Sequence, residues 1–183
     1  MSKHPLTPQH VQAVLDSLGL KTQIIFFEET TATSQQAADQ IGCELGQIVK
    51  SIAFMVNGQP VLVLTSGDQK VDDRKLARHF GVGRKKVKTA KQEELVEIFG
   101  YEAGSVPPIG HRVSGIPLLI DATLERFETL YAAGGAHNAI FAVGYSMLVY
   151  KTKGVVMDVV EENELTETMQ MIADMTEDDQ ASE

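Results

Sequence analysis

The chain has 183 residues and a formal net charge of −9 at neutral pH. Because 43% of its residues are hydrophobic, it can bury a substantial core, which excludes an intrinsically disordered chain. No run approaches the roughly 20 apolar residues of a membrane-spanning helix, and the first residues lack the apolar segment of a secretory signal. The single cysteine, Cys43, excludes an intramolecular disulfide and a cysteine-cluster metal site. We expect one cytoplasmic domain.

The negative charge is concentrated at the end of the chain. Residues 161–183 hold nine Asp or Glu and no Lys or Arg, so residues 1–160 carry 16 basic and 16 acidic side chains. We therefore predict a domain over residues 1–160 and an acidic tail over residues 161–183. Within the domain, residues 70–91 hold nine basic side chains and two acidic ones. Such a segment favours contact with a polyanion, and a solvated helix face is the alternative.

The first half of the chain predicts short helices and a hairpin. Thr7 and Pro8 are typical of a helix start, and we expect that helix to end at Gly19. A strand over residues 23–28 and a short helix capped by Thr33 or Ser34 follow. Residues 48–56 and 61–64 are apolar, β-branched runs on either side of Asn57-Gly58, which is a strong signal for a β-hairpin.

The second half mixes helices, loops and strands. We expect a helix from Asp72 or Asp73 to Gly81, and another that ends at Gly100, with Thr89 and Gln92 at capping-box spacing. Residues 100–111 hold three glycines and two prolines, which precludes regular structure. Strands over 117–121, 129–132, 138–143 and 155–160 and a helix over 144–151 complete the pattern. Without regular βαβ alternation, it predicts a single α+β domain.

Lys50 is the first candidate functional residue. In a strand over residues 48–56 it shares a face with the bulkiest apolar side chains, Ile52 and Phe54 among them, while Ser51 and its alternate neighbours occupy the other face. A lysine that shields a sheet edge would give this pattern. So would a fixed cation at the mouth of a pocket, where it could hold a phosphate or a carbonyl oxygen.

Two glycine-rich loops are the other candidates. The segment from Gly104 to Pro108 could present backbone N–H groups to a carbonyl oxygen, or it could be a rigid surface loop. In the run from Gly134 to Asn138, a Gly-Gly turn precedes His137 and could place polar side chains at a strand entrance. His111 carries the same ambiguity. We find no metal-ligand spacing, phosphate-binding loop or serine-nucleophile motif.

Taken in order, these segments resemble the YbaK/prolyl-tRNA synthetase-associated family, which includes free-standing relatives of the editing domain of bacterial prolyl-tRNA synthetase. The resemblance covers about residues 20 to 160. It rests on QIVKSI from residue 47, LTSGD from 64 with VD at 71, GYEAGSVPPIGH from 100, PLLID from 117 and GGAHNAIF from 134. The family implies an α+β domain with a mixed, partly barrel-like sheet flanked by helices. It also implies hydrolysis of the ester between a wrong amino acid and its tRNA, without a metal or organic cofactor.

The resemblance also implies roles for individual residues. The family's strand lysine corresponds to Lys50, and its GxxxP loop to Gly104 and Pro108. We assign catalysis to these three and to His137, which would assist the reaction or size the amino-acid pocket. The residues expected to bind the substrate are Ser105, Val106, His111, Gly134, Gly135 and Asn138. Those expected to contact acceptor-stem phosphates are Lys75, Arg78, Arg84, Lys85, Lys86 and Lys88.

Some positions depart from the family, and other functions stay open. Ala133 stands where some members carry a hydroxyl residue, and His137 and Asn138 differ from cysteine-specific members, which leaves alanine, serine and threonine esters as candidates. The expected partner is the acceptor end of tRNA, with prolyl-tRNA synthetase or an elongation factor as alternative protein partners. A non-catalytic tRNA-binding protein on the same fold is one alternative, and an enzyme that forms a Schiff base through Lys50 is another.

Overall fold

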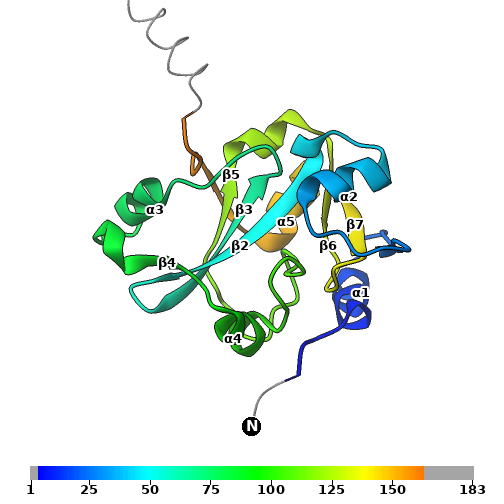
Figure 1. Cartoon of the computed structure of the whole chain (residues 1–183), viewed down its shortest axis with the longest axis horizontal. Coiled ribbons are helices and arrows are strands. Elements are labelled where there is room, and N and C mark those ends of the chain that lie inside the picture. Colours follow the sequence, from blue (N-terminus) through cyan, green and yellow to red (C-terminus); the bar gives the residue numbers. More distant parts are fainter. Residues whose placement is uncertain (1–3, 163–183) are drawn as a thin grey trace, which may run out of the picture.

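A computed structural model describes residues 4–162 (Figure 1). One mixed eight-stranded sheet crosses the domain, in the order β1-β7-β6-β2-β3-β5-β8, with β4 paired to β2. Five α-helices and four shorter helical turns flank it. The strands are β1 (Ile25–Phe26), β2 (Ile48–Val56), β3 (Gln59–Ser66), β4 (Val87–Thr89), β5 (Leu118–Asp121), β6 (Thr129–Ala133), β7 (Ala139–Gly144) and β8 (Val155–Met157). The helices are α1 (Pro8–Ser17), α2 (Ser34–Ile41), α3 (Asp73–His79), α4 (Gln92–Glu94) and α5 (Tyr145–Thr152), and the turns are η1 (Leu45–Gln47), η2 (Arg84–Lys86), η3 (Leu95–Phe99) and η4 (Ala122–Arg126). The predicted α+β fold with a mixed sheet is confirmed.

The predicted hairpin forms the middle of the sheet. β2 and β3 pair antiparallel along their whole length, from Val56 opposite Gln59 back to Val49 opposite Ser66. The two turn residues both have positive φ, 49° at Asn57 and 80° at Gly58, as a two-residue turn of this kind requires. The turn thereby fixes the register that decides which face of β2 each side chain occupies.

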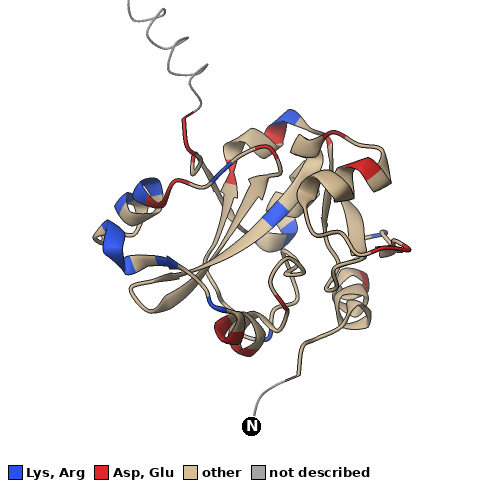
Figure 2. Ribbon diagram, viewed as in Figure 1, with Lys and Arg blue, Asp and Glu red and all other residues tan. Residues whose placement is uncertain are grey.

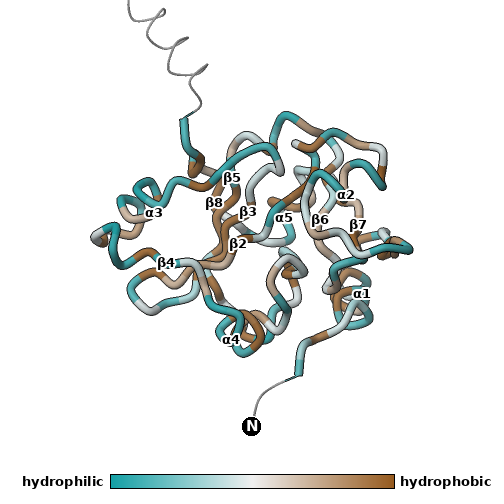
Figure 3. Tube along the Cα trace, viewed as in Figure 1, coloured by the Kyte–Doolittle hydropathy of each residue, from teal (hydrophilic) through white to brown (hydrophobic). Residues whose placement is uncertain are grey.

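The two faces of β2 belong to different parts of the core, as the alternation predicts. Val49 and Ala53 lie in a cluster with buried side chains of α1 and the 100–111 loop. Phe54 and Val56 lie in the second cluster, with Leu76 and Ala77 of α3. Figure 3 shows these apolar strands at the centre, surrounded by hydrophilic connections.

Most helix ends agree with the capping residues read from the sequence. Thr33 accepts a hydrogen bond from the Gln36 backbone N–H, and Asp72 accepts one from that of Arg74. The predicted capping box at Thr89 and Gln92 is wrong, because Thr89 belongs to β4 and pairs with Phe54. The helix is instead capped at Lys91, whose backbone N–H donates to the carboxylate of Glu94 at 2.7 Å.

The helix before Gly100 changes form along its length. After α4 it continues as a π-helical turn, in which the N–H of Gly100 donates to the carbonyl of Leu95 five residues earlier. The left-handed backbone at Gly100, with φ 96°, ends it as predicted. π-Turns are frequent at functional sites. Leu95, at the start of this one, lies in the wall of the cavity described below.

The outermost strands are shorter than predicted. β1 pairs only Ile25 and Phe26 with β7, and β8 ends at Met157. Beyond β8 the chain crosses to an isolated bridge between Val71 and Val160. Residues 163–183, which hold almost all of the predicted acidic tail, lie outside the described residues. Among residues 4–162, no helix has both the length and the apolar character needed to cross a bilayer.

One edge of β2 is only partly paired, and this gap positions the site. Parallel pairing with β6 joins Ile48 and Val49 to Tyr131 and Ala132. Pairing with β4 begins only at Phe54. Between these two partners, residues 50–52 of β2 have no paired strand on this edge among the described residues, because β6 pairs only with the start of β2 and β4 only with its end.

Candidate active site

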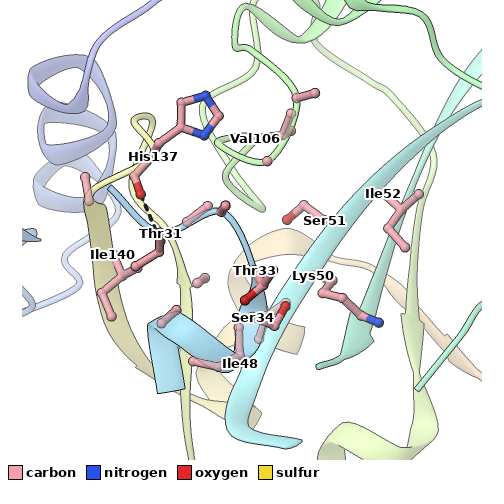
Figure 4. Close-up of a pocket in the computed structure, with 18 of the residues that line it drawn as sticks. Thr31, Thr33, Ser34, Ile48, Lys50, Ser51, Ile52, Val106, His137 and Ile140 are labelled. Carbon is pink, nitrogen blue, oxygen red and sulfur yellow. Dashed lines mark hydrogen bonds between the residues drawn. The ribbon is translucent and has the colours of Figure 1, made fainter. Parts of the chain in front are cut away.

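A cavity of about 650 Å³ occupies the space beside the partly paired edge of β2 (Figure 4). Its wall combines β2, the segment before α2, the loop at Gly104, and the start of β7 with the turn before it. Many of the apolar residues in the wall are small. The lining residues that carry the argument below are Thr31, Lys50, Ser51, Gly104, Val106 and His137.

Lys50 lines the cavity, but its ammonium group points away from it. Figure 4 shows the side chain directed away from His137, on the opposite wall. The Nζ atom donates a hydrogen bond to the carbonyl oxygen of Gln69, in the connection between β3 and α3. Burial lowers the pKa of Lys50 below its ordinary value, and the nearby carboxylate of Asp68 partly offsets this effect. To reach a ligand in the cavity, the ammonium must give up the Gln69 carbonyl.

An arginine holds the acidic neighbour of Lys50 in place. The guanidinium of Arg126 donates to both carboxylate oxygens of Asp68, at 2.9 and 3.1 Å, and to the Ser66 hydroxyl at 2.9 Å. Partial burial disfavours the charge on Asp68, but the hydrogen bonds from Arg126 and Ser66 outweigh it and hold its pKa below the ordinary value. The negative charge beside Lys50 is therefore fixed in position.

Ser51 presents polar groups to the cavity that the sequence analysis did not select. Its Oγ is buried and has no hydrogen-bond partner in the described part of the chain. The backbone carbonyl of Ala53 on the same edge accepts from Ala90, and strand alternation directs the N–H and C=O of Ser51 to that edge as well. A buried polar atom without a partner costs about 1–3 kcal/mol, so these groups are suited to a bound ligand. The sequence held one signal for this role: Ser51 follows Lys50 in the strand, so its side chain points to the other face.

The loop from Gly104 to Pro108 has fewer available donors than its length suggests. The Ser105 N–H and Oγ both donate to the Glu102 carbonyl, at 3.1 and 2.9 Å, and Ser105 is only 2% exposed. Pro107 and Pro108 have no N–H. Within residues 4–162, this leaves the N–H groups of Gly104 and Val106, both residues of the cavity wall, without a partner.

His111 supports this loop from behind. Its Nε2 lies 2.8 Å from the Pro107 carbonyl oxygen, and its ring packs edge-on against Phe99 at a centroid distance of 5.5 Å. Burial lowers the pKa of His111. The ring lies outside the cavity wall, and so do Ser105 and Pro108, which were predicted to act in the site. These three residues shape the loop instead of lining the cavity.

The Gly134-Gly135 turn places His137 across the cavity from Lys50. The ring lies beside Gly104, where an added Cβ would be 3.6 Å from its Nδ1, and its Nε2 is 3.5 Å from a carboxylate oxygen of Glu102. The His137 carbonyl accepts from the Thr31 N–H at 3.0 Å and hydroxyl at 2.9 Å (Figure 4). Gly134 and Gly135 lie outside the wall.

Asn138 also lies outside the wall and holds the segment that leads to it. Its side-chain amide donates to the Phe27 carbonyl at 3.2 Å, and the Phe27 N–H donates to the Asn138 carbonyl at 2.8 Å. These bonds attach the chain after β1 to the start of β7. Asn138 thus positions the Thr31 segment and does not face the cavity.

The six cations predicted to contact RNA lie on α3, η2 and β4 (Figure 2). Lys75 is bound to Asp158 at 2.7 Å, with 16% of its side chain exposed, and Arg84 pairs with Asp73 at 2.9 Å. Arg78, Lys85, Lys86 and Lys88 are exposed and form no ion pair within residues 4–162. No group of three or more potential metal ligands occurs in that same range.

Comparison with known families agrees with this architecture. A model of the aminoacyl-tRNA editing domain matches residues 28–149, which include the whole cavity wall. The chain belongs to the aminoacyl-tRNA editing domain family. The recognition made from the sequence motifs is thus confirmed, and the family acts on tRNA.

Individual relatives place the chain within the editing domains. It is 36% identical over 114 residues to an uncharacterized protein, YwhH of Bacillus subtilis (strain 168), a match that covers 62% of this chain and 70% of YwhH. It is 35% identical over 77 residues to proline–tRNA ligase of Staphylococcus aureus (strain Newman), a match that covers 42% of this chain and 13% of the ligase. A crystal structure described as a candidate trans-editing enzyme for prolyl-tRNA synthetase superposes with a TM-score of 0.79 at 32% identity, over 85% of this chain and 97% of the other.

Proposed function

We propose that the protein is a trans-editing deacylase that hydrolyses the ester bond between a small, wrongly attached amino acid and the 3′ end of a tRNA. The observation that carries this proposal is the cavity beside β2. A lysine, a histidine and two backbone N–H groups without a partner among residues 4–162 surround a space with many small apolar residues. Membership in the editing family and the trans-editing description of a structural relative support it. Proline-family tRNA is the first substrate to test, because a proline–tRNA ligase is among the relatives.

The reaction needs a polarised carbonyl and an activated water. The N–H groups of Gly104 and Val106 would hold the carbonyl oxygen and stabilise the negative charge that develops on it. Water would add to the carbonyl carbon, the bond to the ribose oxygen would break, and that oxygen would take a proton from the water. The vicinal ribose hydroxyl would help to activate the water. His137, with Glu102 beside it, would assist or limit the size of the amino acid.

Lys50 would bind the terminal nucleotide. By exchanging the Gln69 carbonyl for a phosphate or ribose oxygen, its ammonium would hold the nucleotide at the mouth of the cavity. The amino acid would then extend between β2 and the Gly104 loop. Because the exchanged partner is a neutral carbonyl, a phosphate, which carries a negative charge of its own, would give a stronger bond.

A deacylation screen tests the function. Ala-, Ser-, Cys- and Thr-tRNA carrying a labelled amino acid are incubated with the protein, and release of the label is followed over time. We expect release from at least one of them and none from correctly charged Pro-tRNA. Binding of tRNA without release from any of the four would contradict the proposal and favour a non-catalytic tRNA-binding protein.

A Schiff-base enzyme has one supporting observation in the structure. Burial lowers the pKa of Lys50, which favours the neutral amine that such chemistry needs. Borohydride reduction in the presence of a carbonyl substrate would trap the lysine covalently. A trapped adduct at Lys50, detected by mass spectrometry, would replace the deacylase proposal with this one.

Substitution of Gly104 by alanine tests the loop donors. Gly104 has φ 82°, and an added Cβ meets only the His137 ring at 3.6 Å, so the change strains the backbone that orients its N–H. Because loss of one oxyanion donor typically costs about 10²–10³ in rate, we expect kcat for deacylation to fall by at least about tenfold. Gly115→Ala is the matched control, since Gly115 has φ 74° and open space around it. Equal kcat values for the two variants would show that the Gly104 loop takes no part.

A further inference from the structure

A groove lined by lysines adjoins the cavity and contains charges that the proposed reaction does not use. Lys85 and Lys86 of η2, Lys88 of β4 and Lys91 before α4 line it, together with the hairpin turn at Asn57 and Gly58. Thr89 lies in the walls of both the groove and the cavity, so the two spaces adjoin at this residue. Figure 2 shows the blue segment of η2 and β4 beside the end of the hairpin.

In the basic segment, residues 70–91, some cations are paired with carboxylates and others are free to bind a ligand. Lys70 pairs with Glu161 at 2.9 Å, and Lys75 and Arg84 are also bound to carboxylates, as described above. The four groove lysines are exposed and form no ion pair within residues 4–162. Glu94 also lines the groove, so four lysines stand beside a single carboxylate there. The groove therefore presents a strong positive field to a ligand.

The groove is rigidly connected to the strand that carries Lys50. Met55 of β2 pairs with Lys88 of β4, and the Asn57 N–H donates to the Lys86 carbonyl at 2.8 Å. Lys88 shares a sheet face with Met55, and Met55 shares that face with Ser51. Met55 lies four positions after Ser51, about 13 Å along an extended strand. Cavity and groove thus open onto one face at a fixed separation.

We propose that this groove binds the phosphodiester backbone of the single-stranded RNA end that enters the cavity, independently of its base sequence. Lysine ammonium groups are mobile point charges suited to phosphate oxygens. The residues that line the groove include no aromatic side chain, so it offers no surface for base stacking. The groove is therefore suited to the phosphates of the strand and not to stacking of its bases. The inference rests on the proposed function, because the aminoacylated end must lie in the cavity.

Replacing groove lysines with uncharged glutamine tests this proposal. We compare Lys85→Gln/Lys86→Gln/Lys88→Gln with a control that removes three positive charges outside the groove, the cavity and the basic segment, Lys21→Gln/Lys151→Gln/Lys153→Gln. Each lost contact to a single strand reduces the dependence of log affinity on log salt by about 0.7, so we expect the groove variant to lose about 2 from this slope. We expect the control to retain the wild-type slope and affinity. Equal weakening of both variants would show a diffuse field and overturn the groove assignment.

Two further substrates separate this proposal from the proposed function. We expect wild-type protein to bind intact tRNA more tightly than tRNA lacking its single-stranded 3′ end, and the groove variant to lose most of that difference. Loss of duplex binding alone would contradict the assignment. Aminoacyl-adenosine has no phosphate, so both proteins should hydrolyse it at the same rate. If wild-type protein hydrolyses neither aminoacyl-adenosine nor any mischarged tRNA, the deacylase proposal fails, while the RNA-binding comparison still decides the groove.

Discussion

Replacing Lys50 with methionine is expected to lower kcat/KM for deacylation of mischarged tRNA by about 10- to 100-fold, because a hydrogen bond to a charged group contributes about 1.5–3 kcal/mol. The methionine side chain retains most of the length of the lysine but cannot hold a phosphate or ribose oxygen. Initial rates with the best substrate of the screen measure the effect. Lys21→Met is the control, since Lys21 is exposed and lies outside the cavity wall. Wild-type kcat/KM in the Lys50 variant would remove the lysine from the mechanism.

The same substitution should not reduce stability. Burial lowers the pKa of Lys50 in the folded protein, so the unfolded chain binds this proton more tightly. The charged lysine therefore opposes folding at neutral pH, and this effect disappears as pH rises from the lowered pKa to the ordinary value. Thermal unfolding at pH 7 should give Lys50→Met a melting temperature at or above that of wild type. Loss of activity together with retained stability identifies a residue kept for function.

The pH profile provides a second readout of Lys50. If the ammonium form holds the substrate, enzymatic kcat/KM, corrected for uncatalysed ester hydrolysis, should fall as pH rises through the lowered pKa of Lys50. The methionine variant should lack this decline.

Replacing Gly135 with alanine is expected to lower the free energy of unfolding by about 2–4 kcal/mol. The residue has φ 92°, which costs an L-residue about 1–2 kcal/mol, and the added Cβ would lie 2.9 Å from Val11 Cγ2 and 3.1 Å from Tyr101 Cε1. Urea denaturation measures the change. Gly81→Ala is the control, because Gly81 has φ 64° with no atom within 4 Å, so it should lose only the backbone contribution. Equal losses would mean that the contacts with Val11 and Tyr101 add nothing.

This prediction links the N-terminal helix to the site. Val11 is a fully buried residue of α1, and Tyr101 precedes the Gly104 loop. Both pack against the turn that carries His137. A shift of Gly135 would therefore move the two sides of the cavity relative to each other. Any residual activity of Gly135→Ala should fall even at temperatures where the variant is folded.

Local sequence signals predicted most of the secondary structure because each has a local cause. Asn57-Gly58 adopts the positive φ values that the hairpin turn needs, and Thr33 and Asp72 satisfy the first N–H groups of their helices. The capping box assigned to Thr89 was wrong because pairing with β2 takes that residue into a strand. Tertiary pairing here overrides a local pattern, and the same cause limits β1 to the two residues that meet β7.

The candidate site was predicted in its parts but not in its arrangement. Lys50, Gly104, Val106 and His137, which the motifs singled out, line one cavity. Strand alternation placed Lys50 and Ser51 on opposite faces, but it could not tell which residue faces the cavity: Lys50 donates to Gln69 on the far side of the strand, whereas Ser51 faces the cavity. Orientation depends on which neighbours leave space and which offer acceptors, and those neighbours are distant in sequence.

The sequence alone determined the fold class, the family and the separation of charge along the chain, because turn residues, strand alternation and composition are local properties. Only the tertiary structure decided which cations of the basic segment are free to bind a ligand. Lys75 and Arg84 belong to the same basic segment as Lys85, yet folding places a carboxylate against each of the first two. Likewise, the cavity exists because β6 and β4 pair with different parts of β2 and leave a gap between them. Contacts of this kind join residues up to about eighty positions apart, a separation at which no local pattern specifies the partner.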